Sequence, residues 1–392
     1  MQTIERLVAC GPRWPGEDGD PPAVDFIAGE LRRWGRQTRV EPIRVRPAFQ
    51  IALALLCALA VAGSVVSVAS PPLGVVILLV ASVAIYADLT GRPSPVRFLT
   101  SSRRTANVTS PGHLPDARHR IVLTAHHDAA RGGLLYARRA RRRRRPSPLS
   151  RLAGRLDLVF WFAIAALAAA VVRLVTGLDT NTMSAVQFIP TVALILLAAL
   201  LVDNALSRVV PGASDNASGV AALLELAGRL ERRPVENVDV WIVFTAAEEG
   251  FMLGIRAWLA AYADELHKDR TWFVNVDTVG NGRIHHATAE GYALLYRHDR
   301  RLIAACERLG SRPHVLRLGS DGVVPLMRGY PSVTLGALQN GRVPNSHRPS
   351  DTVEKVDPES VEAAADFVEA LVRRIDEAFA QEASAARMPS SA

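Results

Sequence analysis

Five short polar motifs in this chain carry side chains that bind metal ions or exchange protons. The candidate side chains are two histidines and several carboxylates, in the order His126, Asp128, Asp215, Glu248, Glu249, Asp277, His347 and Asp351. Imidazoles combined with carboxylates suit zinc, and several carboxylates suit a pair of metal ions. Each motif alone has an ordinary explanation, such as a solvated strand end. Their occurrence together in one chain predicts a metal site.

The first motif, AHHDAA, follows the apolar stretch IVLTA, which we expect to form a strand. Because alternate residues of a strand share a face, His126 and Asp128 should point together while His127 points away. His126 is therefore the expected ligand. Asp128 is placed to orient its imidazole, as carboxylates commonly do for metal-bound histidine.

The next two motifs supply more carboxylates. Asp215 precedes an expected helix and, taken alone, reads as a helix-capping group, although Asn216 and Ser218 can also cap. Glu248 and Glu249 directly follow a buried strand, where carboxylates are costly without partners. One of the two can bind a metal while the other accepts a proton from a metal-bound water.

The remaining motifs place Asp277 at the end of another apolar strand and His347 with Asp351 in a polar loop. Four of the five motifs end or follow an expected strand. In open α/β sheets, sites form beyond the carboxyl ends of the strands, so we expect these side chains to converge.

The elements that must position these residues alternate between strands and helices. Expected strands are 38–45, 119–128, 238–249, 271–280 and 331–338, and expected helices are 23–35, 218–230, 256–266 and 361–379. Strands such as IVLTA and VWIVFTA are continuously apolar, as in sheets that helices cover on both faces. The pattern predicts an α/β fold with a mostly parallel sheet sandwiched by helices.

Two apolar segments interrupt this pattern and are predicted to be transmembrane helical hairpins, at 48–92 and 156–207. Hydrophobic residues make up 49% of the 392 residues and the mean hydropathy is +0.13, so part of the chain should lie in lipid. Three of the four apolar runs are long enough to span a bilayer, and the run from Leu73 to Leu89 is marginal. Buried core helices are the alternative, but paired runs with almost no charges favour a membrane. Arg173, near the end of its run, should extend towards the lipid headgroups.

The net charge of +8 depends strongly on one arginine run, Arg138–Arg145. It has two interpretations, a nucleic-acid-binding arm or a cytoplasmic topology signal that also contacts anionic lipids. The run has no interleaved aromatic residues and lies beside an apolar segment, which favours the topology signal, so no nucleic-acid partner is expected. The loops inside both hairpins lack Lys and Arg, which predicts an integral membrane protein with its hydrophilic part on the cytoplasmic side. The first 47 residues are mixed and charged, so no signal peptide is expected there.

The motifs, in their order, resemble those of the zinc aminopeptidases of metallopeptidase family twenty-eight, the group of the bacterial leucyl aminopeptidase and the aminopeptidase S and Y types. They match its sequence of His-x-Asp, Asp-Asn-x-Ser-Gly, Glu-Glu, Asp, and His followed by Asp-Thr. The early segment CGPRWPG also resembles the family's opening Gly-Pro-Arg turn. Outside the hairpins, the resemblance extends from Leu7 to Phe379.

The resemblance implies a fold of the zinc exopeptidase type and a site for two Zn²⁺ ions. His126 and Asp277 would hold one ion, Glu249 and His347 would hold the other, and Asp215 would bridge both.

The implied activity is removal of amino-terminal residues from peptide substrates. Glu248 would act as the general base on a metal-bridging water, and Asp128 would steer His126. Two features depart from the family. The arginine run and the second hairpin are inserted between His126 and Asp215, and Gly322 stands where the family often has a histidine.

The resulting division of the chain has three parts of a peptidase domain, two hairpins, a juxtamembrane loop and a disordered tail. The peptidase parts are 1–47, 93–137 and 208–380, the hairpins are 48–92 and 156–207, the arginine-rich loop is 138–155 and the tail is 381–392. Two alternatives remain open. One is a catalytically inactive membrane scaffold or receptor-like relative, and the other is a different zinc enzyme, such as a carboxypeptidase, an amidohydrolase or a glutaminyl-cyclase-like enzyme. The three cysteines form no CxxC pair, so no disulfide framework or cysteine zinc site is expected. The sequence predicts no oligomeric state.

Overall fold

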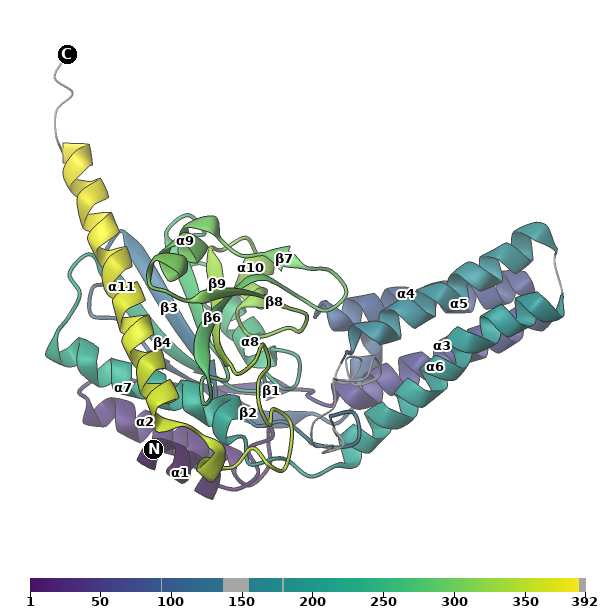
Figure 1. Ribbon diagram of the computed structural model, residues 1–392, viewed down its shortest axis with the longest axis horizontal. Helices are drawn as coiled ribbons and strands as arrows, with labels where there is room; N and C mark the ends of the chain where they lie inside the picture. The colour runs from purple at the N-terminus through teal and green to yellow at the C-terminus, as the bar shows by residue number, and fades with distance from the viewer. Residues whose placement is uncertain (93, 137–154, 178–179, 388–392) are drawn as a thin grey trace, which may run out of the picture.

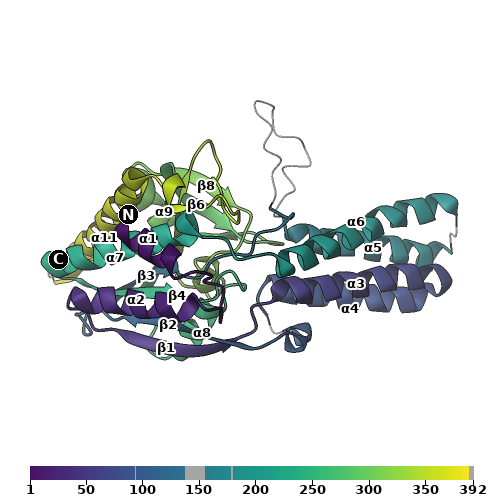
Figure 2. The ribbon, with the colours of Figure 1, turned by 90° about the horizontal axis from the view of Figure 1, so that it is seen from below.

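The computed structural model describes residues 1–92, 94–136, 155–177 and 180–387. A sheet covered by helices forms one part of the molecule, and four long helices project from its side as a bundle (Figures 1 and 2). The arginine run Arg138–Arg145, which we interpret as a topology signal, lies outside the described residues.

Within the described residues, the sheet has nine strands and is mixed. The strands are β1 (Arg39–Val45), β2 (Arg103–Ser110), β3 (His119–His126), β4 (Val238–Thr245), β5 (Thr271–Val276), β6 (Arg283–Glu290), β7 (Tyr296–Arg297), β8 (Arg312–Leu316) and β9 (Ser332–Leu338). Their order is β1-β2-β4-β3-β5-β9-β6-β7, with β8 paired to β6. The inner strands β4, β3, β5 and β9 are parallel, as predicted.

The prediction of a mostly parallel sheet is wrong at both edges. β1 pairs with β2, and β2 with β4, in antiparallel fashion, and β6 is antiparallel to β7 and β9. The first apolar hairpin connects β1 to its antiparallel neighbour β2, so no crossover helix is needed there. The strands β2, β6 and β8 were not predicted. They carry many Thr, Asn, His and Arg residues, so their sequences lack the apolar periodicity on which the prediction was based.

Helices cover both faces of the sheet, and the alternation along each inner strand assigns its side chains to two separate cores. On one face, Ile121 and Leu123 pack with α1 (Gln2–Ala9), α2 (Asp20–Arg33), α7 (Ser218–Arg232), α9 (Arg300–Arg308) and α11 (Pro358–Arg387). On the other face, Val122 packs with α8 (Leu253–Ala261) and α10 (Val323–Met327) in a core that continues into the bundle.

The closing helix is longer than predicted. Residues 381–387, assigned to a disordered tail, belong to α11. This stretch, QEASAAR, is composed largely of good helix formers, which lets the helix extend beyond its buried part.

The four apolar runs form the helices α3 (Phe49–Ala69), α4 (Pro71–Leu89), α5 (Asp157–Thr176) and α6 (Asn181–Leu206). Each is long and apolar enough to cross a membrane, including α4, whose run was marginal. Helices α3 and α4 approach so closely that a Cβ on Gly74 would collide with Ser67, and glycine permits this approach because it has no Cβ. Contacts between small residues of this kind are typical of helix pairs in lipid.

Some polar side chains inside the bundle form hydrogen bonds with one another. Nε2 of Gln187 donates to the hydroxyls of Ser64 at 2.9 Å and Ser67 at 2.8 Å. Arg173 was expected to extend towards the lipid headgroups, but its side chain is buried. Its Nη2 donates to Ser184 Oγ on α6 at 3.2 Å.

Candidate metal centre

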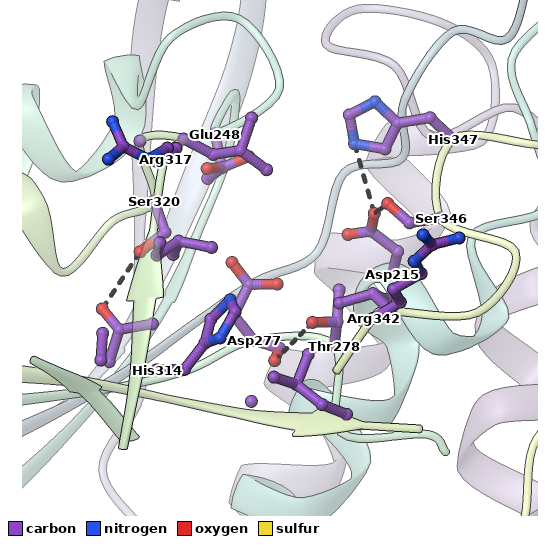
Figure 3. Close-up of a pocket in the computed structure, with 18 of the residues that line it drawn as sticks. Asp215, Glu248, Asp277, Thr278, His314, Arg317, Ser320, Arg342, Ser346 and His347 are labelled. Carbon is purple, nitrogen blue, oxygen red and sulfur yellow. Dashed lines mark hydrogen bonds and ion pairs between the residues drawn. The ribbon is translucent and has the colours of Figure 1, made fainter. Parts of the chain in front are cut away.

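The residues singled out by the sequence motifs meet beyond the carboxyl ends of the parallel strands. His126 ends β3, the Glu248–Glu249 pair follows β4, and Asp277 follows β5. Asp215 precedes α7, and His347 lies in the loop after β9. Figure 3 shows the side chains of Asp215, Glu248, Asp277 and His347 around one cavity.

Asp215 lies between the two histidines and directs one carboxylate oxygen to each. Its Oδ1 is 3.5 Å from Nε2 of His126, and its Oδ2 is 3.3 Å from Nε2 of His347. Each histidine faces a second carboxylate as well. Oδ1 of Asp277 is 3.7 Å from Nε2 of His126, and Oε1 of Glu249 is 3.3 Å from Nε2 of His347. Two groups of donor atoms therefore share Asp215.

The adjacent glutamates diverge. Glu249 faces His347, whereas Oε2 of Glu248 lies 4.0 Å from Nε2 of His126. Both side chains are buried and line the cavity. Two carboxylates on neighbouring residues thus serve different halves of the site.

Asp128 fixes the turn that carries both glutamates. Its carboxylate accepts hydrogen bonds from the backbone N–H groups of Glu248 and Glu249, both at 3.1 Å. Oδ1 also lies 3.4 Å from Nδ1 of His126, so one buried carboxylate contacts both β3 and the glutamate turn. His127 points to the opposite side, where its Nε2 lies 3.1 Å from the carbonyl oxygen of Ala106.

Asp351 supports the other side of the site in the same way. Its carboxylate accepts hydrogen bonds from the backbone N–H groups of Ser214, at 2.9 Å, and Asp215, at 3.0 Å. The interpretation of Asp215 as a helix-capping residue is wrong. Oδ1 of Asn216 accepts the N–H of Gly219 at 3.0 Å, which is a cap for α7 and leaves the Asp215 carboxylate facing the histidines.

Arg13 joins these two sides, and sequence reasoning gave it no role. Its side chain is fully buried and donates to the carbonyls of His127 at 3.0 Å, Gly212 at 2.8 Å and Leu7 at 3.0 Å. Burial lowers the pKa of Arg13 to about 10, which leaves it charged at neutral pH. The only sequence signal for this role was the resemblance of the Gly-Pro-Arg turn to the family's opening. Without that resemblance, an arginine in a turn is expected to be solvated.

The charges of the site depend on one another. Burial opposes protonation of His126 and His347, but the surrounding carboxylates raise the pKa of both well above its ordinary value. Burial also raises the pKa of Glu249 and Asp277. In contrast, the two histidines hold the pKa of Asp215 well below its usual range despite burial.

This donor set fits a divalent cation. Positive charge is needed among buried carboxylates, and either protons on the two imidazoles or a bound cation can supply it between them. Oε1 of Glu249 is buried and takes part in no hydrogen bond. His126, Asp215 and Glu249 each offer a donor atom within 4.8 Å of the others. Nitrogen and carboxylate oxygen donors at this spacing are typical zinc ligands.

The cavity has a volume of about 470 Å³, within the range of small-ligand sites. Part of its lining comes from the apolar helices, namely Phe49 at the start of α3 and Leu156 just before α5. The ring of Phe49 lies 4.5 Å from that of Phe251, which in turn stacks on Tyr292 at 5.0 Å. The bundle therefore forms one wall of the cavity.

Gly322, where the resemblance leads one to expect a histidine, is tightly packed. A Cβ on Gly322 would collide with Oγ1 of Thr334. The preceding residue, Asp321, is buried, accepts a hydrogen bond from the hydroxyl of Thr245, and has a pKa raised by burial to about 7.

Comparisons with known proteins agree with this geometry. Residues 200–372, which include six of the eight residues singled out from the motifs, match the model described as peptidase family M28. No curated protein matches the chain.

The fold is that of solved zinc exopeptidases and glutaminyl cyclases. A leucine aminopeptidase precursor from Bacteroides thetaiotaomicron is 14% identical with a TM-score of 0.54, covering 95% of this chain and 94% of that one. A Zn-dependent exopeptidase from Parabacteroides distasonis is also 14% identical, with a TM-score of 0.53 and coverage of 95% and 96%. A glutaminyl cyclase from Porphyromonas gingivalis is 14% identical, with a TM-score of 0.57 and the same coverage.

Proposed function

We propose that this protein is a membrane-anchored di-zinc aminopeptidase that removes amino-terminal residues from peptides. The observation that carries the proposal is the position of Asp215, whose two oxygens face two different histidines. His126, Asp277 and Asp215 would hold one zinc ion, and His347, Glu249 and Asp215 would hold the other. When bound, zinc would supply Lewis acidity that makes water more acidic and stabilises the oxyanion of the attacked carbonyl.

Glu248 is the proposed general base. Its carboxylate lies beside the proposed ligands but is not in close contact with either imidazole. Oε2 of Glu248 is 4.0 Å from Nε2 of His126. Burial raises the pKa of Glu248 well above its ordinary value, an effect that His126 reduces and Glu249 increases. A carboxylate with a raised pKa can accept a proton from water near neutral pH and return it to the leaving amine.

Asp128 and Arg13 are proposed positioning residues. Asp128 holds the glutamate turn through two N–H groups, and Arg13 bonds to the segments that carry His126 and Asp215. Buried partners of this kind keep ligand side chains in place and affect both metal affinity and activity.

The substrate is proposed to be the end of a peptide located near the bilayer. Phe49 and Leu156 belong to the bases of helices that we propose to be membrane-spanning, and both line the cavity. A volume of about 470 Å³ suits a few residues and not a long stretch of chain. We propose that the peptidase part lies on the cytoplasmic side, on the basis of the arginine bias alone.

A single-zinc enzyme of the glutaminyl-cyclase type is the second candidate. One observation favours it, because His126, Asp215 and Glu249 form a compact donor group that suffices for one ion. Glutaminyl cyclases are also among the similar folds. The two candidates differ in reaction, since a cyclase converts an amino-terminal glutamine without releasing a residue.

A panel of aminoacyl anilides and glutaminyl peptides, assayed with detergent-purified protein, separates these functions. The proposal expects release of aniline, loss of this activity with a chelator, and recovery when zinc is added. Cyclisation of glutaminyl peptides without anilide cleavage would favour the second candidate. A zinc-loaded protein that turns over neither substrate would support an inactive scaffold.

A further inference from the structure

The turn that carries Glu248 and Glu249 has an unusual backbone. Ala247, Phe251 and Met252 all have positive φ, at 55°, 79° and 54°, although none is glycine. A non-glycine residue in this backbone region is strained and persists only where its surroundings hold it. The groups that hold this turn therefore bear directly on the position of the two glutamates.

Some of these groups belong to the sheet. Asp128 binds the two glutamate N–H groups. Asn107 on β2 accepts the N–H of Ala246 at 2.9 Å and donates to the carbonyl of Gly254 at 3.0 Å. These contacts fix both ends of the turn on the side that faces the sheet.

The first apolar hairpin holds the remaining side of the turn through Arg97. This residue lies in η1 (Pro95–Leu99), a short 3₁₀ helix that follows α4. Its Nε and Nη2 donate to both oxygens of Asp88, at 2.7 and 3.1 Å. Asp88 is a buried residue in the last turn of α4. Paired hydrogen bonds between arginine and a carboxylate fix the plane of the guanidinium.

The third nitrogen of Arg97 reaches the metal-binding turn. Nη1 donates to the carbonyl of Gly250 at 3.1 Å and to that of Arg46 at 3.2 Å. The guanidinium also lies over the ring of Phe251, 5.3 Å from its centroid. Gly250 and Phe251 are the two residues directly after Glu249, so Arg97 acts within one or two residues of a proposed ligand.

Arg256 makes a second connection from the opposite side. It donates to the carbonyls of Thr90 at 3.4 Å and Gly91 at 3.2 Å, just after α4, and to that of Phe251 at 3.3 Å. In addition, a Cβ on Gly250 would lie only 2.8 Å from Cβ of Pro47, which precedes α3. The turn is thus enclosed by the two ends of the first hairpin.

We propose that Arg97, held in place by Asp88, is a positioning residue for the Glu248–Glu249 turn, so that the first hairpin is a structural part of the catalytic site. The expected effects of this contact on zinc binding and peptide cleavage rest on the proposed function. The contact between the hairpin and the turn is independent of that function.

The competing interpretation is that Arg97 serves only to neutralise the buried Asp88. Two nitrogens of Arg97 satisfy that carboxylate, and neutralisation alone needs no bond from Nη1 to Gly250. The two interpretations differ in what happens to the turn when Arg97 changes. Neutralisation predicts a loss of overall stability, whereas positioning predicts local opening of residues 247–252 in protein that remains folded.

The test compares Arg97→Gln, Asp88→Asn and Arg97→Lys in the full-length protein in detergent. Arg92→Gln is the matched control, because Arg92 lies at the same end of the hairpin but stacks on Tyr86, 5.2 Å from its ring centroid, away from the turn. The first measurement is hydrogen exchange of peptides covering 247–252 in zinc-free protein. The second is zinc affinity by chelator competition, and the third is kcat and KM with an aminoacyl anilide.

We expect exchange in 247–252 to accelerate about 10-fold in Arg97→Gln and to a smaller degree in Asp88→Asn, with Arg92→Gln unchanged. Zinc affinity should fall about 10-fold, the lower end of the effect of changing groups that support metal ligands. The loss of activity should appear in kcat with little change in KM. Arg97→Lys should be intermediate, because an ammonium cannot reach all the acceptors that the guanidinium spans.

Unchanged exchange in 247–252 in both Arg97→Gln and Asp88→Asn would overturn the proposal, whatever the activity. Equal acceleration in Arg92→Gln, or across the whole protein, would also overturn it in favour of general destabilisation. If Arg97→Gln does not fold, Asp88→Asn and Arg97→Lys carry the same comparison. If the wild-type protein binds no zinc, the proposed function fails while the exchange measurement still decides the role of Arg97.

Discussion

The candidate metal centre buries charged side chains, whereas the helical bundle exposes apolar ones. At the centre, the charged groups Arg13, Asp128 and Asp351 are buried and hydrogen bonded. In the bundle, apolar side chains such as Val83 and Phe188 are exposed, at 59% and 66%. At most half of the most apolar part of each bundle helix is covered by the rest of the protein. The centre is an enclosed polar interior, whereas the exposed apolar surface of the bundle supports our proposal that these helices lie in hydrocarbon.

The largest expected effect lies at the centre. Glu248→Gln keeps the size of the side chain but removes the proton acceptor, so kcat should fall about 10²–10⁴-fold. Zinc content should stay at the wild-type level, because Glu248 is not a proposed ligand. Steady-state kinetics and metal analysis of the same sample test this. Wild-type kcat in the variant would show that another group accepts the proton.

A charge on the surface that we propose to face lipid tests the membrane location of the bundle. Val80→Lys places a cation near the middle of α4 at a side chain that is 55% exposed. Membrane insertion should become less favourable by about 2.5–3.5 kcal/mol. The matched control is Val40→Lys on β1, where the side chain is 39% exposed and the expected change in unfolding free energy is within about 0.5 kcal/mol.

The inserted fraction of each variant can be measured by alkaline extraction of membranes. Equal insertion of Val80→Lys and wild type would show that this face of α4 meets water or protein. The comparison drawn above between the two regions would then fail for α4.

A smaller effect is expected at the support for the glutamate turn. Asp128→Asn leaves one of the two N–H groups of Glu248 and Glu249 facing an amide NH₂ instead of an acceptor. Zinc affinity should fall about 10–100-fold. Competition with a chelator measures this. Unchanged affinity would mean that the glutamate turn keeps its position without Asp128.

The smallest effect is expected inside the bundle. Gln187→Leu removes the hydrogen bonds to Ser64 and Ser67, which in membrane proteins are worth about 0.6 kcal/mol on average. Stability in detergent should change by about 1 kcal/mol or less, with kcat unchanged. A large fall in kcat would instead connect the far end of the bundle to the metal centre.

The sequence predicted best where one physical signal dominated. The apolar runs were sufficient to locate the four bundle helices to within a few residues, because spanning length and lack of charge are strong constraints. Continuous apolar strands located β3, β4, β5 and β9, with the site residues at their ends. The ligand roles themselves remain predictions.

The sequence failed where polar residues are buried through specific partners. β2 reads RRTANVTS and has only two apolar residues, both in the core on one face of the strand. Asn107 and Thr109 are nevertheless buried, because Gly254, Ala246 and Trp258 supply hydrogen bonds to them. Those partners are far away in the chain, so no local pattern contains them. The same is true of Arg13 and of Arg97, whose acceptors lie on other elements.

Zinc stoichiometry tests the central claim most directly. Metal analysis of purified protein should give about two zinc ions per chain, in keeping with the two donor groups. His126→Ala and His347→Ala should each lose one ion, and Asp215→Ala should lose both, because its two oxygens face the two histidines. One tightly bound zinc in the wild type, retained in either histidine variant, would contradict a shared two-metal site.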